Sequence, residues 1–388
     1  MAQEQLNPEE VVLGEEINHV RLITLNRPRQ LNVISARVVE LLAEYLENWE
    51  KDDDAQLVIF KGAGRAFCAG GDLKMFYAGK TGRDVCLEVV YRMYWLCYHI
   101  HTYKKTMVSL ANGIIMGGGA VMVVPLKFSV VTEKTVFALP EASIGLHTDC
   151  SFSYILSHLP GHLGEYLGLT GARLDGKEML AAGLATHFVP SEKIQELENR
   201  LLSLNSGDEN AIRNVIEDFS LKVQPDEDSI LHKLSTINKC FCKESVEEII
   251  EAFEAEGNTE ENKWIGPVLK GLKRSSPTGL KITLRSIREG RKQMLEKCLK
   301  KEFRLTINMI RSMISGDLYE GIRALAIDKD NTPKWEPATV AEVTKEKLDL
   351  VFEPYSTELE LQIPADGEAF RWDGKYENSV YPNLKGEQ

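Results

Sequence analysis

Two glycine-dense turns constrain this chain more than any other feature of its sequence. The first is Phe67-Cys68-Ala69-Gly70-Gly71-Asp72, and the second is Gly117-Gly118-Gly119. Each follows a predicted strand, and a turn without Cβ atoms lets backbone N–H groups approach a ligand closely. If the turns converge, they aim two N–H donors at one oxygen, the geometry that stabilises an oxyanion on an acyl carbonyl. The alternative is that each turn serves only the tight packing of backbone.

The composition is typical of a globular enzyme and argues against several other classes. With 388 residues, 43% of them hydrophobic and 27% charged, the chain can bury a large core. A formal charge of −12 argues against binding to nucleic acid or to an anionic membrane. The seven scattered cysteines predict free thiols in a reducing compartment. Cys240 and Cys242 lack a second pair at zinc-binding spacing, so we predict no metal site.

Strands and helices alternate in the first half of the chain, which predicts an α/β fold. Predicted strands cover 18–25, 56–60, 107–111, 127–132 and 135–139, and predicted helices cover 36–50, 83–102 and, buried, 120–124. After about Pro190 the pattern is helical, near 193–205, 227–238, 244–255, 258–273, 278–291 and 293–314. We expect residues 331–388 to wrap the surface as a tail, with one strand at 359–363.

Two glycine-rich stretches, Gly62-Ala63-Gly64 and the triple glycine, come near to nucleotide-binding fingerprints, but neither matches. Gly62-Ala63-Gly64 lacks its third glycine because Phe67 stands there, and no Gly-Lys-Ser/Thr follows the triple glycine. A nicotinamide or nucleoside triphosphate enzyme is therefore disfavoured.

The two turns belong to a longer order of motifs. Leu25-Asn26-Arg27-Pro28 precedes them, and Phe137-Ala138-Leu139-Pro140-Glu141 follows them. In this order the chain resembles the crotonase (enoyl-CoA hydratase/isomerase) superfamily over about residues 10–190. Further stretches are similar to one branch, the 3-hydroxyisobutyryl-CoA hydrolases, at 169–176, 183–189, 286–290 and 328–337. The resemblance implies a crotonase-like ββα-spiral core that binds acyl-CoA (10–190), a C-terminal helical region (191–330) and the tail (331–388).

The resemblance also assigns the site. It places an oxyanion hole on the backbone N–H groups of Ala69 and Gly118, and it gives Glu141 the task of activating water or attacking the thioester. A carboxylate after Pro140 can be desolvated so that its pKa rises; the alternative is a carboxylate that stabilises a helix N-terminus. Asp149 is implied to bind a substrate 3-hydroxyl group. Its alternative is an N-cap for a helix starting near Ser151, and both roles can hold.

Val121 separates the hydrolase branch from the hydratases. Hydratases of this superfamily use a second glutamate just after the triple glycine, and valine cannot move a proton. Two departures from the hydrolase branch stand out. His147-Thr148-Asp149-Cys150-Ser151 replaces a Phe-Pro-Asp-Val-Gly pattern, and Met93 stands where the branch tends to place a glutamate. His147 is either an acid–base group or a loop histidine, and Cys68 is expected to be a small buried thiol.

Candidate contacts for coenzyme A lie in two places. Helical spacing predicts one basic face, which includes Lys281 and Arg285; the alternative is an ordinary solvated face. The second place surrounds the first glycine turn, with candidates at Arg29, Gly70, Gly71 and Asp72.

We therefore predict hydrolysis of a short branched 3-hydroxyacyl-CoA, foremost 3-hydroxyisobutyryl-CoA of valine breakdown. Coenzyme A is part of the substrate, and no other cofactor is expected. The alternatives are an acyl-CoA binder with little or no catalysis and an enoyl-CoA isomerase. We expect no nucleic-acid or membrane partner and leave a homo-oligomer open. The location is left open: the resemblance implies a peroxisome, with other relatives in mitochondria. Gly386-Glu387-Gln388 is not an SKL-type peroxisomal address, however, and the termini by themselves predict the cytoplasm.

Overall fold

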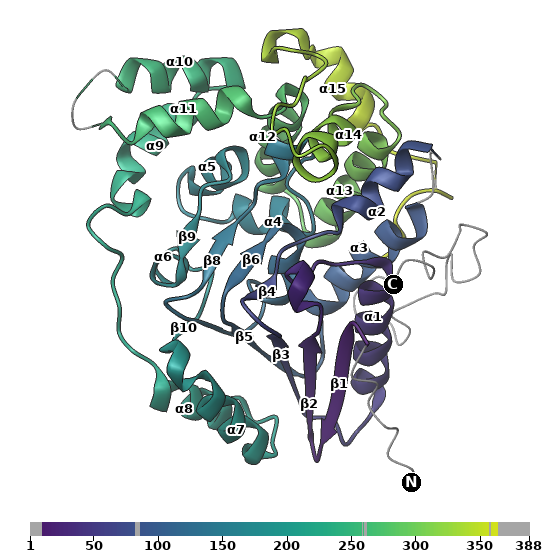
Figure 1. Cartoon of the computed structure of the whole chain (residues 1–388), viewed down its shortest axis with the longest axis vertical. Helices are drawn as coiled ribbons and strands as arrows, with labels where there is room; N and C mark the ends of the chain where they lie inside the picture. Colours follow the sequence, from purple (N-terminus) through teal and green to yellow (C-terminus); the bar gives the residue numbers. More distant parts are fainter. Residues whose placement is uncertain (1–9, 82–85, 258, 260–261, 357, 364–388) are drawn as a thin grey trace.

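The computed structural model describes residues 10–81, 86–257, 259, 262–356 and 358–363, and two β-sheets form its centre (Figure 1). The larger sheet has the order β1-β2-β3-β5-β7-β10, and the smaller has the order β4-β6-β8-β9. The larger sheet contains β1 (Val12–Ile17), β2 (Val20–Leu25), β3 (Leu57–Gly62), β5 (Thr106–Ala111), β7 (Phe128–Val131) and β10 (His187–Phe188). The smaller sheet contains β4 (Ala66–Cys68), β6 (Ile114–Met116), β8 (Val136–Ala138) and β9 (Leu174–Asp175). The predicted α/β class is confirmed.

A repeated strand–strand–helix step builds both sheets at once. β3 leads into β4, β5 into β6 and β7 into β8, so each step adds one strand to each sheet. Gly113 permits the bend between β5 and β6, because its φ is +104° and a Cβ there would lie 2.2 Å from the Arg65 carbonyl oxygen. Pairing of β4 with β6 brings the two glycine-rich turns, which follow these strands, to the same edge.

Helices cover both faces of the larger sheet, because its parallel strands are apolar on both sides. One face packs against α1 (Ala36–Lys51) and α3 (Leu87–His101). α1 begins where the Ser35 side chain accepts the Val38 N–H. The opposite face packs against α7 (Ile194–Leu204) and α8 (Glu209–Phe219), which lie at the lower left in Figure 1.

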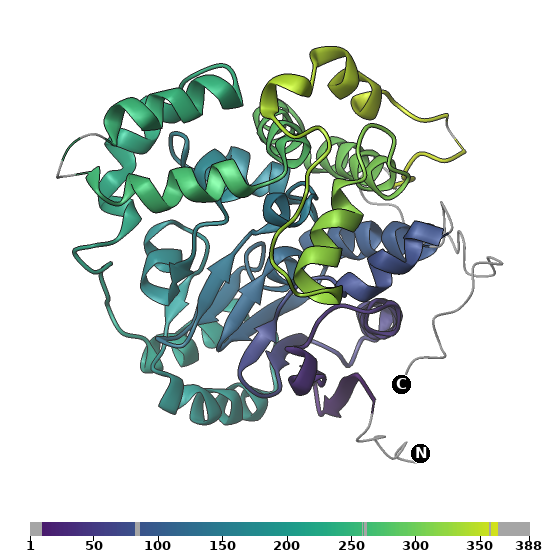
Figure 2. The same cartoon turned by 45° about the horizontal axis from the view of Figure 1, so that its top comes forward.

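The remaining helices fold back over the core (Figure 2). α12 (Pro277–Gly290) packs against α4 (Phe152–Ser157) and α5 (Leu163–Thr170), and α13 (Leu295–Ile310) packs against α3. The other helices of this region are α9 (Leu234–Phe241), α10 (Val246–Glu256), α11 (Ile265–Arg274), α14 (Asp317–Ile322) and α15 (Lys345–Phe352). α12 and α13 therefore contribute side chains to the core. None of the described helices combines the length and apolarity needed to cross a bilayer.

Several sequence-based boundaries were wrong. The strand expected at 359–363 does not form; the Gln362 N–H donates instead to the Tyr91 hydroxyl at 3.0 Å, which holds this segment against α3. β1, α8 and α15 were not predicted, and the helix expected at 120–124 starts earlier, as the 3-10 helix η3 (Gly117–Met122). Val351 and Phe352 of α15 are buried, so the tail is partly core. Its remainder, 364–388, lies outside the described residues.

Candidate active site

The two glycine turns converge. A Cβ on Gly70, whose φ is +92°, would lie 2.9 Å from the Met116 carbonyl oxygen and 3.7 Å from the Gly117 Cα. A Cβ on Gly117 would lie 3.9 Å from the Gly70 Cα and 2.8 Å from Glu141 Oε1. Only glycine allows both backbones to approach this closely at these dihedral angles. Glu141 therefore lies directly beside the point where the turns meet.

The amide groups of the turns are not all free. Gly118 is the second residue of η3, so its N–H has no acceptor within the helix. The Ala69 N–H, by contrast, donates to the Leu31 carbonyl at 3.0 Å. The prediction that Ala69 supplies an oxyanion donor is therefore wrong for this structure, because neighbouring backbone already occupies that N–H group.

The next free amide in the first turn belongs to Gly71. The Ile34 N–H donates to the Gly70 carbonyl at 2.8 Å, and the Asp72 N–H donates to the Ile34 carbonyl at 2.9 Å. In this parallel bridge the Gly71 N–H points away from Ile34. β6 and the triple glycine lie on that other side, and no described residue accepts the Gly71 N–H. Gly71 and Gly118 thus offer two free donors, one from each turn.

Glu141 is a buried carboxyl group with one unsatisfied oxygen. It opens the 3-10 helix η4 (Glu141–Ile144) directly after Pro140, and its side chain is 5% exposed. Its Oε2 has no hydrogen-bond partner in the described part of the chain. Burial, followed by the nearby charges of Asp149 and Glu302, raises the pKa of Glu141 well above its ordinary value. The predicted desolvation is confirmed, and such a group can accept a proton from water.

Asp149 is held by side chains rather than serving as a helix cap. The Tyr94 hydroxyl lies 3.0 Å from its Oδ2. Burial raises the pKa of Asp149 to about 6, against the lowering effect of the Tyr94 hydrogen bond. The N–H groups of Ser151 and Ser153 at the start of α4 are accepted instead by Glu302, at 2.7 and 2.8 Å. The alternative role of Asp149 as an N-cap is therefore wrong.

Glu302 is a site residue that sequence reasoning missed. It lies on α13, is fully buried, and burial raises its pKa to about 7. Its two N–H contacts fix a loop in which Cys150 and Ser151 adopt φ of +55° and +75°, a region that L-residues disfavour. The only sequence signal was a charged residue on the apolar face of a predicted helix, between Leu299 and Phe303.

The two departures from the hydrolase branch lie at the site. Met93 is buried, with its Cε 3.8 Å from the position of a Cβ on Gly118, and the Cys150 Sγ lies 2.9 Å from the same position. His147 is fully buried and hydrogen-bonded to Thr306, and burial lowers its pKa to about 3. His147 is thus a neutral core histidine in the resting protein.

Two further expectations concern side chains in the first half of the chain. Val121 is buried beside the triple glycine, and no acid occupies its place. Cys68 is fully buried, with its thiol donating to the Asn32 carbonyl at 3.1 Å, and burial raises its pKa to about 12. The interpretation of Cys68 as a small buried thiol is confirmed.

The predicted basic face for coenzyme A is already neutralised. Lys281 Nζ lies 2.6 Å from Glu247 and donates to the Val343 carbonyl at 3.0 Å. Arg285 pairs with Glu289 and Asp349 and stacks on the Phe352 ring at 4.0 Å. Because both cations have partners within the fold, the structure argues against Lys281 and Arg285 as free phosphate contacts.

The candidates near the first turn divide into two kinds. Asp72 caps α2 (Leu73–Ala78) by accepting the Lys74 N–H and pairs with Arg27 at 3.4 Å, so its role is structural. Arg29 lies on the 3-10 helix η1 (Pro28–Gln30), is exposed, and has no ion-pair partner in the described chain. Of the basic residues predicted to contact coenzyme A, Arg29 is thus the candidate with a free charge.

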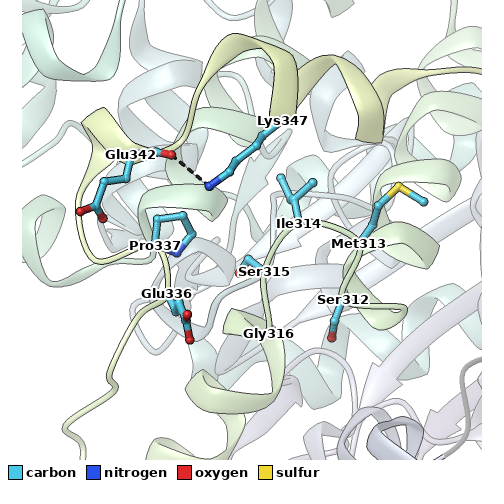
Figure 3. A pocket seen from close by; sticks show the side chains of 9 residues that line it. All are labelled: Ser312, Met313, Ile314, Ser315, Gly316, Glu336, Pro337, Glu342 and Lys347. Atoms are coloured by element: carbon cyan, nitrogen blue, oxygen red, sulfur yellow. Dashed lines mark hydrogen bonds between the residues drawn. The ribbon is translucent and has the colours of Figure 1, made fainter.

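A separate hollow of about 570 Å³ opens beside the C-terminal helices (Figure 3). Its floor is the loop after α13, and it is lined by Ser312, Met313, Ile314, Ser315, Gly316, Glu336, Pro337, Glu342 and Lys347. Lys347 bonds the Glu342 carbonyl at 3.3 Å across the rim. None of the predicted site residues lines this hollow. The described residues also contain no group of three or more His, Cys, Asp or Glu side chains arranged for a metal ion.

Comparison with known proteins places this geometry in a family. Residues 20–352 match the enoyl-CoA hydratase/isomerase family model. The chain is 67% identical to Arabidopsis thaliana 3-hydroxyisobutyryl-CoA hydrolase-like protein 5 over 388 residues, all of both chains. It is 44% identical to A. thaliana 3-hydroxyisobutyryl-CoA hydrolase 1 over 355 residues, 91% of this chain and 94% of that one. A crystal structure of a carnitinyl-CoA dehydratase from Mycobacterium thermoresistibile superposes with a TM-score of 0.83 at 34% identity, covering 93% of this chain and 100% of that one.

Proposed function

This chain belongs to the enoyl-CoA hydratase/isomerase family, and we propose that it hydrolyses the thioester of a short branched 3-hydroxyacyl-CoA, with 3-hydroxyisobutyryl-CoA as its substrate. One observation carries the proposal: the buried, unsatisfied carboxyl group of Glu141 lies where the two glycine turns meet. The names of its relatives supply the acyl chain. The reaction would place the protein in valine breakdown.

In the proposed reaction the thioester oxygen binds between the N–H groups of Gly71 and Gly118. Both groups gain strength as the oxygen becomes negative, and losing one such donor typically costs about 10²–10³ in rate. Glu141 takes a proton from water, whose oxygen adds to the carbonyl carbon. The carbon–sulfur bond then breaks, and the proton returns to the sulfur of coenzyme A. The products are a 3-hydroxy acid and free coenzyme A.

The surroundings of Glu141 favour hydrolysis over water addition to a double bond. Addition requires a second group that moves a proton to or from the α-carbon. Val121, the second residue after the triple glycine, offers no such group. Asp149 is held by Tyr94 within the same buried cluster, where we propose that it binds the substrate hydroxyl.

Release of free thiol from 3-hydroxyisobutyryl-CoA tests the proposal directly. The purified chain should release coenzyme A from this substrate faster than from unbranched or longer acyl-CoAs. Glu141→Ala should lower kcat by about 10³ or more, since it removes the group that activates water. Glu192→Ala, which changes an exposed glutamate, serves as the matched control and should keep wild-type turnover.

Two results would overturn the assignment. Tight binding of the substrate with no thiol release would favour the non-catalytic binder, and a double-bond shift in an enoyl-CoA would favour the isomerase. Unchanged turnover in Glu141→Ala would remove this side chain from the mechanism.

A further inference from the structure

A chain of buried polar groups leads away from Asp149 into the protein. The Tyr94 hydroxyl lies 3.0 Å from Asp149 Oδ2 and 2.8 Å from Thr306 Oγ1. Thr306 Oγ1 lies 2.9 Å from His147 Nε2. All four residues are at most 9% exposed. They come from α3, the 147–151 loop and α13, so the fold assembles the chain from three separate parts of the sequence.

His147, at the far end of this series of hydrogen bonds, determines which group donates in each of them. His147 Nδ1 lies 3.1 Å from the Thr148 carbonyl oxygen, which only accepts hydrogen bonds, and we assign the ring proton to Nδ1 on this contact. In a neutral ring Nε2 is then an acceptor. The Thr306 hydroxyl donates to it, and the Thr306 oxygen remains free to accept from Tyr94.

The number of hydrogen atoms available for these hydrogen bonds depends on the charge of Asp149. If Asp149 is protonated, it donates to Tyr94, Tyr94 donates to Thr306, and Thr306 donates to His147, so each of the three contacts has one hydrogen. If Asp149 is ionised, only the two hydroxyl hydrogens remain for three contacts, and one hydrogen bond is lost. A buried site makes such a loss costly.

We propose that Tyr94, Thr306 and His147 form a buried relay that ends on Asp149 and favours the protonated form of this carboxyl group. They are positioning residues, because they act on substrate only through Asp149. The inference rests on the role proposed above for Asp149 and deepens it. A neutral Asp149 removes one of the negative charges that raise the pKa of Glu141, so it favours the ionised Glu141 that accepts the proton of water.

The other charged and titratable groups around Asp149 do not replace the relay. They are Glu141 on η4, Glu302 and Lys301 on α13, Cys97 on α3 and Cys150 on the same loop. Glu302 is committed to two N–H groups, and Lys301 Nζ donates to the Ser286 carbonyl and to Gln293. Burial raises the pKa of Asp149, and the side-chain hydrogen bonds that Tyr94, Cys150 and Thr306 make to its anion act against this rise.

Infrared titration of the full chain reads the carboxyl group without depending on turnover. The band of the protonated acid is assigned by its loss in Asp149→Asn, and its midpoint is expected at about pH 6 or above in the unmodified chain. Thr306→Val leaves the Tyr94 hydroxyl only Asp149 as a partner, which favours the ionised form. We expect the midpoint to fall by roughly one pH unit. Thr306→Ser keeps the hydroxyl and should keep the midpoint.

Thermal unfolding checks that each variant is folded. An equal shift in Thr306→Val and Thr306→Ser, or a midpoint that does not move in Thr306→Val, would overturn the relay. The infrared band is measured without substrate. The titration can therefore disprove the relay without affecting the hydrolase assignment, and a lack of thiol release would not affect the relay.

Discussion

Replacing Gly117 by alanine tests whether the position of the Glu141 carboxyl group controls the rate, independently of the stability of the fold. A Cβ on residue 117 would lie 2.8 Å from Glu141 Oε1, whereas ordinary contacts begin at 3.4 Å. The carboxyl group must therefore move by ~0.6 Å or more. Because a misplacement of about 1 Å can cost on the order of 10² in rate, we expect kcat to fall by about 10–100-fold.

Alanine at residue 117 also carries a backbone cost, because φ there is +52° and an L-residue in the left-handed region loses roughly 1 kcal/mol. Gly183→Ala is the matched control. Gly183 has φ of +75°, and a Cβ there would meet no atom within 4 Å. Both variants should lose a similar free energy of unfolding, but only Gly117→Ala should lose thiol release.

The assay is coenzyme A release at saturating substrate, with chemical denaturation measured on the same preparations. Wild-type kcat in a folded Gly117→Ala variant would refute the placement of Glu141 at the junction of the turns. Equal losses of kcat in both glycine variants would show that backbone strain, not contact with the carboxyl group, controls the rate.

Three further outcomes follow from the geometry. Arg29→Ala should raise KM for the acyl-CoA several-fold with kcat nearly unchanged. Arg285→Ala should leave KM unchanged and lower the melting temperature, because Arg285 forms an ion pair with Asp349. The reverse pattern would indicate that the basic face of α12, and not Arg29, contacts coenzyme A. Glu302 has a pKa raised from 4.5 to about 7, so the stability that it contributes is full below about pH 4.5 and is lost as the pH rises through 7. Denaturant titration from pH 4.5 to 8 should show this decline, and a Glu302→Leu variant that kept the same slope would contradict it. Cys68→Ser should keep turnover within a few-fold, since the buried thiol has no role in the reaction; loss of more than 10²-fold in a folded variant would argue otherwise.

The site draws on parts of the chain that lie far apart in sequence. The glycine turns and Glu141 come from the strand-rich part, whereas Glu302 and Thr306 come from α13. Glu302 holds the loop that carries Asp149, and Thr306 joins Tyr94 to His147. The helical region therefore contributes side chains to the candidate active site.

The sequence alone determined the parts of this protein that depend on local backbone chemistry. The glycines at 70 and 117 are visible in the sequence and predicted turns in which backbone groups approach closely, and their positive φ angles agree with this prediction. The alternation of strands and helices gave the α/β class, and a carboxylate after Pro140 gave the buried Glu141. Val121 argued against a hydratase because valine has no proton to move.

Only the tertiary structure decided which groups are free to act. Ala69 and Gly71 lie two positions apart in the sequence. The Leu31 carbonyl accepts the Ala69 N–H, whereas the segment around Ile34 leaves the Gly71 N–H without an acceptor in the described chain. The helical spacing of Lys281 and Arg285 predicts a basic face on α12, and this face forms. Glu247 and Asp349, which are distant in the chain, neutralise it. Hydrogen bonds and ion pairs between distant segments depend on how the chain packs in three dimensions, and a local pattern carries no record of that packing.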